Sequence, residues 1–238
     1  MERKHFILVH GAWHGSWCWH KVKAHLLARG HAVTTPDLPG HFHNQEDFKN
    51  VTLARYVAHI EKYVRSSSQP VTLVGHSMAG TVISQIAENI PDKIKRLVYV
   101  AAFIPEDHHS LTDEVSKATT PTLDALLTPN IEGAAIHLQI SEDLRESFYA
   151  NCTDDDTAFA LSRLQAQPLF PFTDTISISH ERFGSVPKLY IQCLCDKAIL
   201  PQDQHRMAVH AGCTIVTLNT DHSPFFSADK ALADLIDS

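Results

Sequence analysis

The stretch LVGHSMAG, residues 73–80, decides the fold of this chain. An apolar run at 70–74 leads into it, and apolar residues at helical spacing follow at 81–89. Ser77 therefore stands where a buried strand turns into a helix. A serine in a strand–turn–helix context, with small residues two positions before and after it, is typical of a nucleophile elbow.

The residues around Ser77 fit the chemistry of such an elbow. A hydroxyl is a poor nucleophile unless a sharp turn holds it out from the backbone beside a base, and this turn tolerates only small neighbours. Gly75 and Ala79 are small, although alanine carries one methyl group more than the usual glycine. The helix that starts near Met78 directs its free N–H groups toward the same place. An ordinary turn with an incidental serine is the alternative, and the agreement of the strand, turn and helix signals argues against it.

Outward from the elbow, strand-like and helix-like segments alternate along most of the chain. Buried strands are expected at 6–9, 31–35, 70–74, 94–103, 187–194 and 214–218, and helices at 19–28, 52–64, 82–90, 207–210 and 230–236. Such alternation is typical of a parallel sheet with helices on both faces. We therefore predict an α/β fold with a mostly parallel sheet of about six strands.

The segment 105–185, which we name the cap, breaks this alternation. It contains helical candidates at 123–127, 142–151 and 157–167, separated by Pro and Ser/Thr segments, and no clear strand. The alternative is an irregular loop on the surface, but the many Leu and Phe residues of this segment need a surface to bury against. We predict a helical cap inserted into a single domain, 1–238, whose core comprises 1–104 and 186–238.

Composition excludes several kinds of partner. The 238 residues carry a net charge of −7 without a basic block, which argues against nucleic acid and anionic membranes. No apolar run approaches the ~20 residues of a membrane span. The start of the chain, 1–5, passes directly into the first strand and is too short for a signal peptide. We expect a small-molecule substrate, and the sequence leaves a homodimer open.

The cysteines and histidines indicate neither a disulfide framework nor a metal site. The cysteines are Cys18, Cys152, Cys193, Cys195 and Cys213. Their odd number leaves at least one unpaired, so we expect reduced thiols in a cytoplasmic protein. Cys193 and Cys195 are predicted to be core residues on one face of a strand. The seventeen histidines are scattered without ligand spacing, so we expect no metal and no cofactor.

Three polar residues follow buried strands in the order Ser77, Asp196, His222. The carboxyl ends of parallel strands lie on one edge of a sheet, so these side chains can meet there. A serine nucleophile, a histidine base and an orienting aspartate could then cleave a carbonyl compound. From the residues alone, three other aspartates are also candidates for the acid that orients the histidine. These are Asp174, Asp203 and Asp221.

Two backbone N–H groups are candidates to stabilise the oxyanion of such a reaction. One is that of Met78, directly after the serine, and the other is that of Ala12, in a glycine-containing loop after the first strand. His76 is expected to pack beside the site rather than act as the base, because a neighbour of Ser77 in the turn points away from it. His10 is expected to anchor its loop.

The chain resembles the α/β-hydrolases, in the subfamily of plant methylesterases, related bacterial carboxylesterases and α/β-fold hydroxynitrile lyases. The matching blocks are FILVHGAWHGSWCW (6–19), TPDLPG (35–40), LVGHSMAG (73–80), FGSVPKLYIQ (183–192), CDK (195–197) and DHS (221–223). The resemblance implies the α/β-hydrolase fold, Asp196 as the triad acid, and Ala12 and Met78 as oxyanion donors. We also assign Gly11 and Trp13 as candidate substrate-binding residues.

Three functions remain open on this basis: a carboxylesterase, a hydroxynitrile lyase, and a ligand receptor without turnover. The resembling lyases have a lysine after the catalytic histidine, a threonine in the first loop and an acidic residue before the serine. Here these positions are Ser223, Gly11 and His76, which favours the esterase. The Phe and Leu density of the cap indicates an apolar acyl or alcohol group in the substrate.

Overall fold

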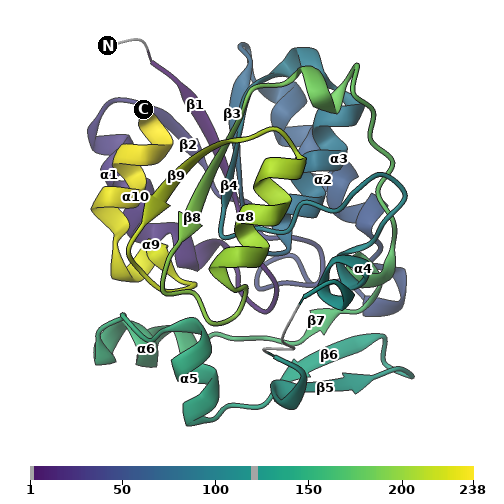
Figure 1. The fold of residues 1–238 in the computed structure, drawn as a ribbon, viewed down its shortest axis with the longest axis vertical. Helices are drawn as coiled ribbons and strands as arrows, with labels where there is room; N and C mark the ends of the chain where they lie inside the picture. The colour runs from purple at the N-terminus through teal and green to yellow at the C-terminus, as the bar shows by residue number, and fades with distance from the viewer. Residues whose placement is uncertain (1–2, 119–122) are drawn as a thin grey trace.

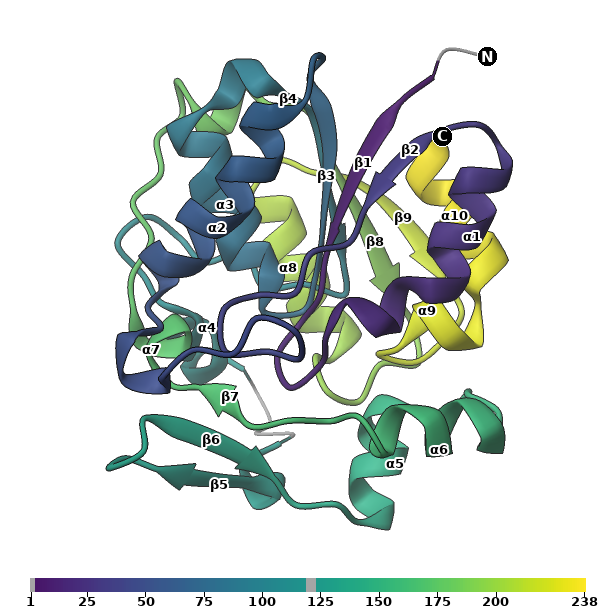
Figure 2. The same cartoon turned by 180° about the vertical axis from the view of Figure 1, so that it is seen from behind.

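A six-stranded sheet forms the centre of the molecule (Figures 1 and 2). The computed structural model of the chain describes residues 3–118 and 123–238. The strands are β1 (His5–Val9), β2 (Ala32–Thr34), β3 (Val71–His76), β4 (Ile94–Val100), β8 (Lys188–Cys193) and β9 (Thr214–Leu218). They are all parallel, in the order β2-β1-β3-β4-β8-β9. The predicted sheet is confirmed.

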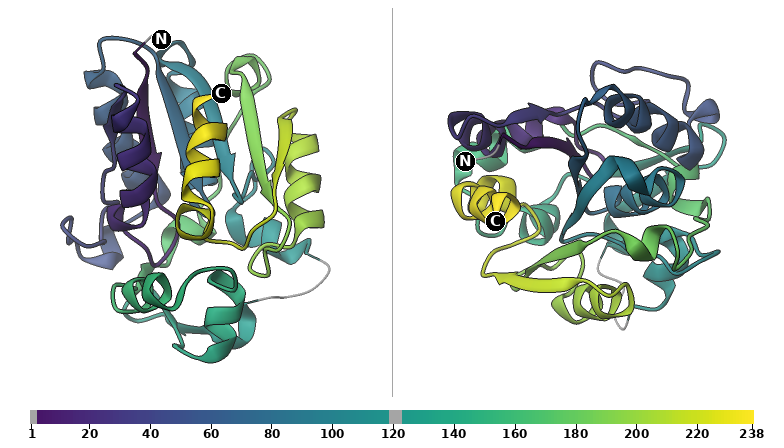
Figure 3. Two further views of the ribbon diagram at one scale, coloured as in Figure 1. Left: turned by 90° about the vertical axis from the view of Figure 1, so that its left-hand side faces the viewer. Right: turned by 90° about the horizontal axis from the view of Figure 1, so that it is seen from above.

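Helices cover both faces of this sheet, as the view from above shows (Figure 3). One face carries α1 (His20–Ala28), α9 (Pro224–Ser227) and α10 (Asp229–Asp237). The other carries α2 (Leu53–Ser66), α3 (Ala79–Asn89) and α8 (Pro201–His210). Single 3-10 turns lie at Ser16–Trp19, Phe48–Asn50, Pro91–Lys93, Asp124–Leu126 and Phe183–Ser185. The arrangement is the α/β-hydrolase fold that the sequence predicts.

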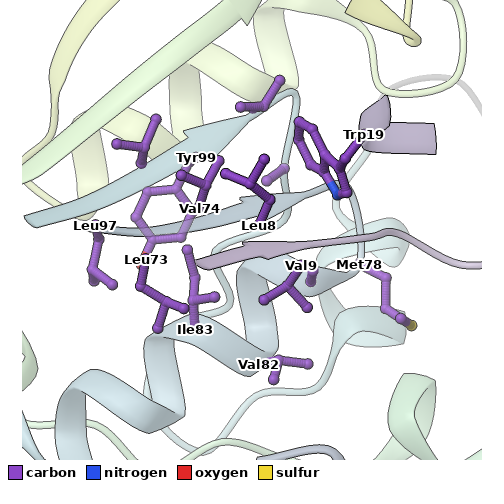
Figure 4. Packing of buried hydrophobic residues seen from close by; sticks show 14 of the residues in the cluster. Leu8, Val9, Trp19, Leu73, Val74, Met78, Val82, Ile83, Leu97 and Tyr99 are labelled. Atoms are coloured by element: carbon purple, nitrogen blue, oxygen red, sulfur yellow. The ribbon is translucent and has the colours of Figure 1, made fainter. Parts of the chain in front are cut away.

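Strand β3 lies inside the sheet and delivers Ser77 at its end. All its residues are buried, because β1 and β4 flank it and helices cover both faces. Leu73 and Val74 pack among Leu8, Leu97 and Ile83 around it (Figure 4). A strand buried on both faces reads as a continuous apolar run, which is why the sequence revealed it.

The cap lies largely across the carboxyl ends of the strands, below the sheet in Figure 1. Its elements are α4 (Leu111–Ser116), β5 (Leu127–Asn130), β6 (Ala135–Leu138), α5 (Glu142–Phe148), α6 (Asp154–Leu161), β7 (Gln167–Pro168) and α7 (Phe170–Thr173). The prediction of a purely helical cap is wrong. A three-stranded antiparallel sheet, β5-β6-β7, makes up part of it.

Short strands with prolines explain this error. Strand β5 contains Pro129 and β7 contains Pro168, and proline usually argues against a strand. Both strands lie at the edges of the small sheet, where a residue without an N–H can be accommodated. The central strand β6 has no proline, but its four residues are too few to establish a period.

Some predicted boundaries and one burial assignment also need correction. The helix expected at 142–151 ends at Phe148, and the helix expected at 157–167 spans Asp154–Leu161. Cys193 is buried, but Cys195 lies beyond the end of β8 and is exposed. Met1 and Glu2, the first residues of the segment that is expected to be too short for a signal peptide, lie outside the described residues. Within those residues, no helix is long and apolar enough to cross a membrane.

Candidate active site

Ser77 occupies a sharp turn between β3 and α3. Its φ of 53° lies in the left-handed region, which a non-glycine residue adopts only when its surroundings hold it there. A Cβ on Gly75 would lie 2.8 Å from the carbonyl oxygen of Ala79, so this position requires glycine. A Cβ on Gly80 would lie 2.1 Å from the carbonyl oxygen of Phe103, a constraint that no motif in the sequence marks.

The side chains of Ser77, His222 and Asp196 form a hydrogen-bonded line. His222 Nδ1 lies 2.8 Å from Asp196 Oδ2, and His222 Nε2 lies 3.1 Å from Ser77 Oγ. A carboxylate oxygen only accepts, so Nδ1 carries the proton and Nε2 of the neutral ring accepts from the serine hydroxyl. All three residues are buried, with Ser77 the most exposed at 8%. This is the geometry that a serine nucleophile and a histidine base require.

Donors from the loop that follows β8 and from α8 hold the carboxylate of Asp196. Its Oδ1 accepts from the backbone N–H groups of Ala198 and Ile199, at 2.8 and 2.9 Å. Its Oδ2 accepts from Gln204 Nε2 on α8, at 2.8 Å. The carboxylate therefore faces His222 in a fixed orientation. No motif in the sequence identifies Gln204.

None of the three rival aspartates forms a hydrogen bond or ion pair with His222 in the described structure. Asp174 Oδ2 accepts from the N–H of Leu53, and Asp203 lies 3.9 Å from the guanidinium of Arg206. Asp221 is fully buried and accepts from the N–H groups of Asn151 and Ser223 and from the hydroxyl of Ser227. These distances are 2.7, 3.1 and 2.7 Å respectively.

Two buried histidines support the site without lying in the hydrogen-bonded line. His76 Nε2 donates to the backbone carbonyl of His222 at 2.8 Å, so it anchors the residue that carries the base. His10 Nδ1 donates to the carbonyl of Gly11, because its Nε2 accepts from the N–H of Leu38. Burial lowers the pKa of His76 well below its usual range and that of His10 to about 4. Both rings are therefore neutral near pH 7.

The backbone N–H groups of Ala12 and Met78 are the expected oxyanion donors. Among the described residues, the hydrogen bonds leave both groups without an acceptor, although both residues are buried. Buried N–H groups without a partner are uncommon in folded proteins. Both residues line a cavity together with Ser77 and His222. Both groups are therefore candidates to stabilise negative charge that develops on an atom beside Ser77.

The cavity has a volume of about 300 Å³ and extends from Ser77 into the cap. The cap contributes apolar side chains to its wall. They include Leu127, Ile136, Phe148, Leu169 and Phe172. Trp13 also lines it, whereas Gly11 is packed behind the wall, where a Cβ would lie 2.8 Å from His76 Nδ1.

One part of the cavity wall is polar. Glu114 in α4 is buried and forms ion pairs with Lys117 and Arg206, at 2.8 and 3.0 Å. Glu114, Arg206 and Asp203 all line the cavity. No cluster of three or more His, Cys, Asp or Glu residues with the arrangement of a metal site occurs in the described parts of the chain.

Known proteins are similar to this chain in sequence. Methylesterase 2 of Arabidopsis thaliana is 31% identical over 98% of this chain and 94% of that protein. Salicylic acid-binding protein 2 of Nicotiana tabacum is 33% identical over 90% of this chain and 87% of its own length. A model of the alpha/beta hydrolase family matches residues 6–235.

Solved structures agree with this relationship. A pyrethroid hydrolase from Sphingobium faniae JZ-2 has a TM-score of 0.89 at 26% identity, with 99% of this chain and 96% of that chain covered. Polyneuridine aldehyde esterase has a TM-score of 0.88 at 26% identity, with 99% and 98% covered. The chain belongs to the alpha/beta hydrolase family.

Proposed function

We propose that this protein is a serine hydrolase that cleaves carboxylic esters through an acyl-enzyme intermediate. The observation that carries the proposal is the hydrogen-bonded line from Ser77 through His222 to Asp196, at 3.1 and 2.8 Å. It lies at a cavity with two free backbone donors. The methylesterase and esterase relatives support the same class of reaction.

Acylation begins when Ser77 Oγ attacks the ester carbonyl carbon and its proton moves to His222 Nε2. Asp196 holds the ring by its Nδ1–H and stabilises the imidazolium that forms. The N–H groups of Ala12 and Met78 bind the oxyanion of the tetrahedral intermediate. When this intermediate collapses, the C–O bond to the alcohol breaks, and the alcohol leaves with the proton from His222.

Deacylation repeats these steps with water as the nucleophile. His222 takes a proton from the water, whose oxygen attacks the acyl carbon and forms a second tetrahedral intermediate. The same two N–H groups bind its oxyanion. Collapse then releases the carboxylic acid and returns the proton to Ser77. The cycle balances without a cofactor, and we propose none.

The contacts around the base and the first loop favour hydrolysis over cyanohydrin cleavage. A threonine at Gly11 would clash with His76 Nδ1 and with Ser77 Cβ, at 2.8 and 2.9 Å from the new Cβ. Ser223, which follows the base, is fully buried and carries no charge to stabilise cyanide. We therefore expect no cleavage of mandelonitrile above the buffer rate.

The substrate is a small ester whose acyl or alcohol part is apolar. A cavity of about 300 Å³ lined mainly by aliphatic and aromatic side chains supports this class. Methyl jasmonate esterase 1 of Vitis vinifera and the methylesterases of Arabidopsis thaliana are relatives whose names indicate small esters. A panel of methyl and p-nitrophenyl esters of graded bulk would identify the preferred size.

We place the protein in the cytoplasm, acting without a nucleic-acid or membrane partner. The five cysteines are free, which supports a reducing compartment. Fractionation of cells that express a tagged chain would test the location. Sedimentation velocity would distinguish a monomer from the homodimer that the sequence leaves open.

Replacement of the nucleophile and the base tests the proposed function. Ser77→Ala and His222→Ala should each lower kcat for a p-nitrophenyl ester by roughly 10⁴–10⁶, because the members of a triad act as a unit. Ser223→Ala is the matched control, since it removes a buried hydroxyl that lacks a hydrogen-bond partner in the described structure. More than a tenth of the activity in either triad variant would refute the assignment.

A further inference from the structure

One of the contacts between the cap and the first loop of the core is made by a tyrosine. Tyr149 follows α5, and its hydroxyl lies 2.8 Å from Nε2 of His14, a residue 135 positions earlier in the chain. His14 Nδ1 lies 2.8 Å from the carbonyl oxygen of Ala12. Tyr149 and His14 are both buried. Neither side chain belongs to the line formed by Ser77, His222 and Asp196.

The directions of these hydrogen bonds follow from elementary chemistry. A carbonyl oxygen only accepts, so Nδ1 of His14 must carry a proton and donate to Ala12. A neutral imidazole then has a lone pair on Nε2, and the hydroxyl of Tyr149 must donate to it. Burial lowers the pKa of His14 to about 3 and raises that of Tyr149 well above its usual range. These hydrogen-bond directions therefore persist across the pH range of ordinary assays.

The hydrogen bonds from Tyr149 to His14 and from His14 to Ala12 end on the residue that supplies an oxyanion donor. The carbonyls of the two peptide groups that flank Ala12 are both held: His10 donates to Gly11 O, and His14 donates to Ala12 O. Because peptide groups are planar, the bond from His10 to Gly11 O fixes the direction of the N–H of Ala12. The bond from His14 to Ala12 O fixes the next peptide plane, and so the backbone on the other side of the Ala12 Cα. Trp13, which follows, has a φ of 60°, an uncommon conformation that needs such support.

We propose that Tyr149 is a positioning residue for ester hydrolysis, whose hydroxyl orients the oxyanion donor of Ala12 through His14. The inference rests on the proposed function. Its consequence is that the cap contributes to transition-state stabilisation in addition to forming the cavity wall. An interaction that strengthens only when negative charge develops raises kcat rather than lowering KM.

Other contacts between the cap and this loop limit the size of the effect. The N–H of Gln165 donates to the carbonyl of Trp13 at 3.0 Å, and the indole N–H of Trp13 donates to the carbonyl of Ile136 at 3.1 Å. These bonds do not involve Tyr149. The loop should therefore keep its fold when the hydroxyl of Tyr149 is removed. The N–H of Ala12 should then be held less firmly in the direction of the oxyanion.

Tyr149→Phe removes only the hydroxyl and tests the inference. We expect kcat for a p-nitrophenyl ester to fall about tenfold while KM stays within twofold. Complete loss of an oxyanion donor costs about 10²–10³ in kcat, and a misdirected donor should cost less. The inhibition constant of a trifluoromethyl ketone, which forms a tetrahedral adduct with the serine, should rise by the same factor as kcat falls.

Tyr99→Phe is the matched control. Tyr99 is also fully buried and its hydroxyl also makes a single hydrogen bond, to Ser84 Oγ at 2.8 Å, but it lies in the core and does not line the cavity. Both variants should lose similar thermal stability, and Tyr99→Phe should keep kcat within twofold.

Three results would overturn the inference: an unchanged kcat in Tyr149→Phe, equal losses of kcat in both variants, or a raised KM with unchanged kcat. The proposed function is tested separately by Ser77→Ala. Ester turnover that is lost in Ser77→Ala but unaffected by Tyr149→Phe would refute only the role of Tyr149.

Discussion

The core loops and the cap of this protein are built in different ways. Ser77, Asp196 and His222 follow β3, β8 and β9, parallel strands whose neighbours fix where each one ends. The cap consists of short helices and strands of two to four residues that pack over those ends (Figure 2). A rigid sheet can position the atoms that react, whereas shorter elements can vary the shape of the pocket without disturbing them.

This difference predicts which kinetic parameter each region controls. Changes in the core loops should act on kcat by orders of magnitude, because they alter groups that meet the reacting atoms. Changes in the cap wall should instead alter the choice between substrates. Tyr149 is the expected exception, since it lies in the cap and acts on a core loop.

The largest effect is expected in the core, from Asp196→Asn. An asparagine offers its amide to His222 and favours the wrong imidazole tautomer, so kcat should fall by roughly 10⁴. Steady-state kinetics on one aryl ester would measure this. Asp203→Asn, on the neighbouring helix, is the control and should change kcat by less than tenfold. If the two variants behaved in the opposite way, Asp196 would not be the triad acid.

A smaller effect is expected in the cap, from Leu127→Ala. Leu127 lines the cavity, so its truncation leaves space for a larger acyl or alcohol group. We expect the ratio of kcat/KM for a bulky ester to that for a small one to rise about tenfold, since a methylene in an apolar pocket is worth about 1–3 kcal/mol. A panel of esters of graded size would measure the ratio.

Leu138→Ala is the control for this change. Leu138 pairs with Leu127 across the cap sheet and is also partly buried, but it lies outside the cavity wall. The same rise in both variants would mean that loosening of the cap, and not the shape of the wall, sets the preference.

The smallest expected effect is on the pH dependence of the free energy of unfolding. It arises from the buried histidines of the core loops. Burial lowers the pKa of His41 well below its usual value, so below about pH 6.5 the unfolded chain binds a proton that the folded protein excludes. The free energy of unfolding should therefore fall with decreasing pH, by up to about 1.4 kcal/mol per pH unit for each such histidine. Urea unfolding at several pH values would measure this slope.

His41→Gln should reduce that slope by about 1.4 kcal/mol per pH unit. His43→Gln is the matched control, because His43 lies two positions along the same loop but is exposed. Equal slopes in the two variants would show that His41 does not titrate differently in the folded and unfolded states.

Much of the core could be predicted from the sequence, because its central strands β1, β3, β4 and β8 are largely buried on both faces. The runs FILV and VTLV have no polar interruption beyond one threonine, and each ends in glycine-containing segments. The cap sheet could not be predicted in this way. Its pairing of Leu127 with Leu138 arises from tertiary contacts, and Pro129 and Pro168 indicate breaks when read locally.

The site shows a similar division. Ser77 and His222 could be predicted because each follows a recognisable strand. The assignment of Asp196 as the triad acid needed the family resemblance. Whether an aspartate there can reach the histidine depends on the loop between β8 and α8. Gln204 and Tyr149 meet their partners only in the folded chain, and no sequence pattern identifies them. A glycine inside a helical pattern was the one signal for the tight approach at Gly80.

Covalent labelling tests the central claim most directly. A fluorophosphonate reacts with an activated serine, whose oxygen bonds to phosphorus as fluoride leaves. We predict one phosphonyl group per chain, on the peptide that contains Ser77, and a loss of labelling in His222→Ala, because the base activates the hydroxyl. Mass spectrometry of the digested protein would locate the adduct. An adduct on another residue, or none while ester turnover persists, would contradict the account.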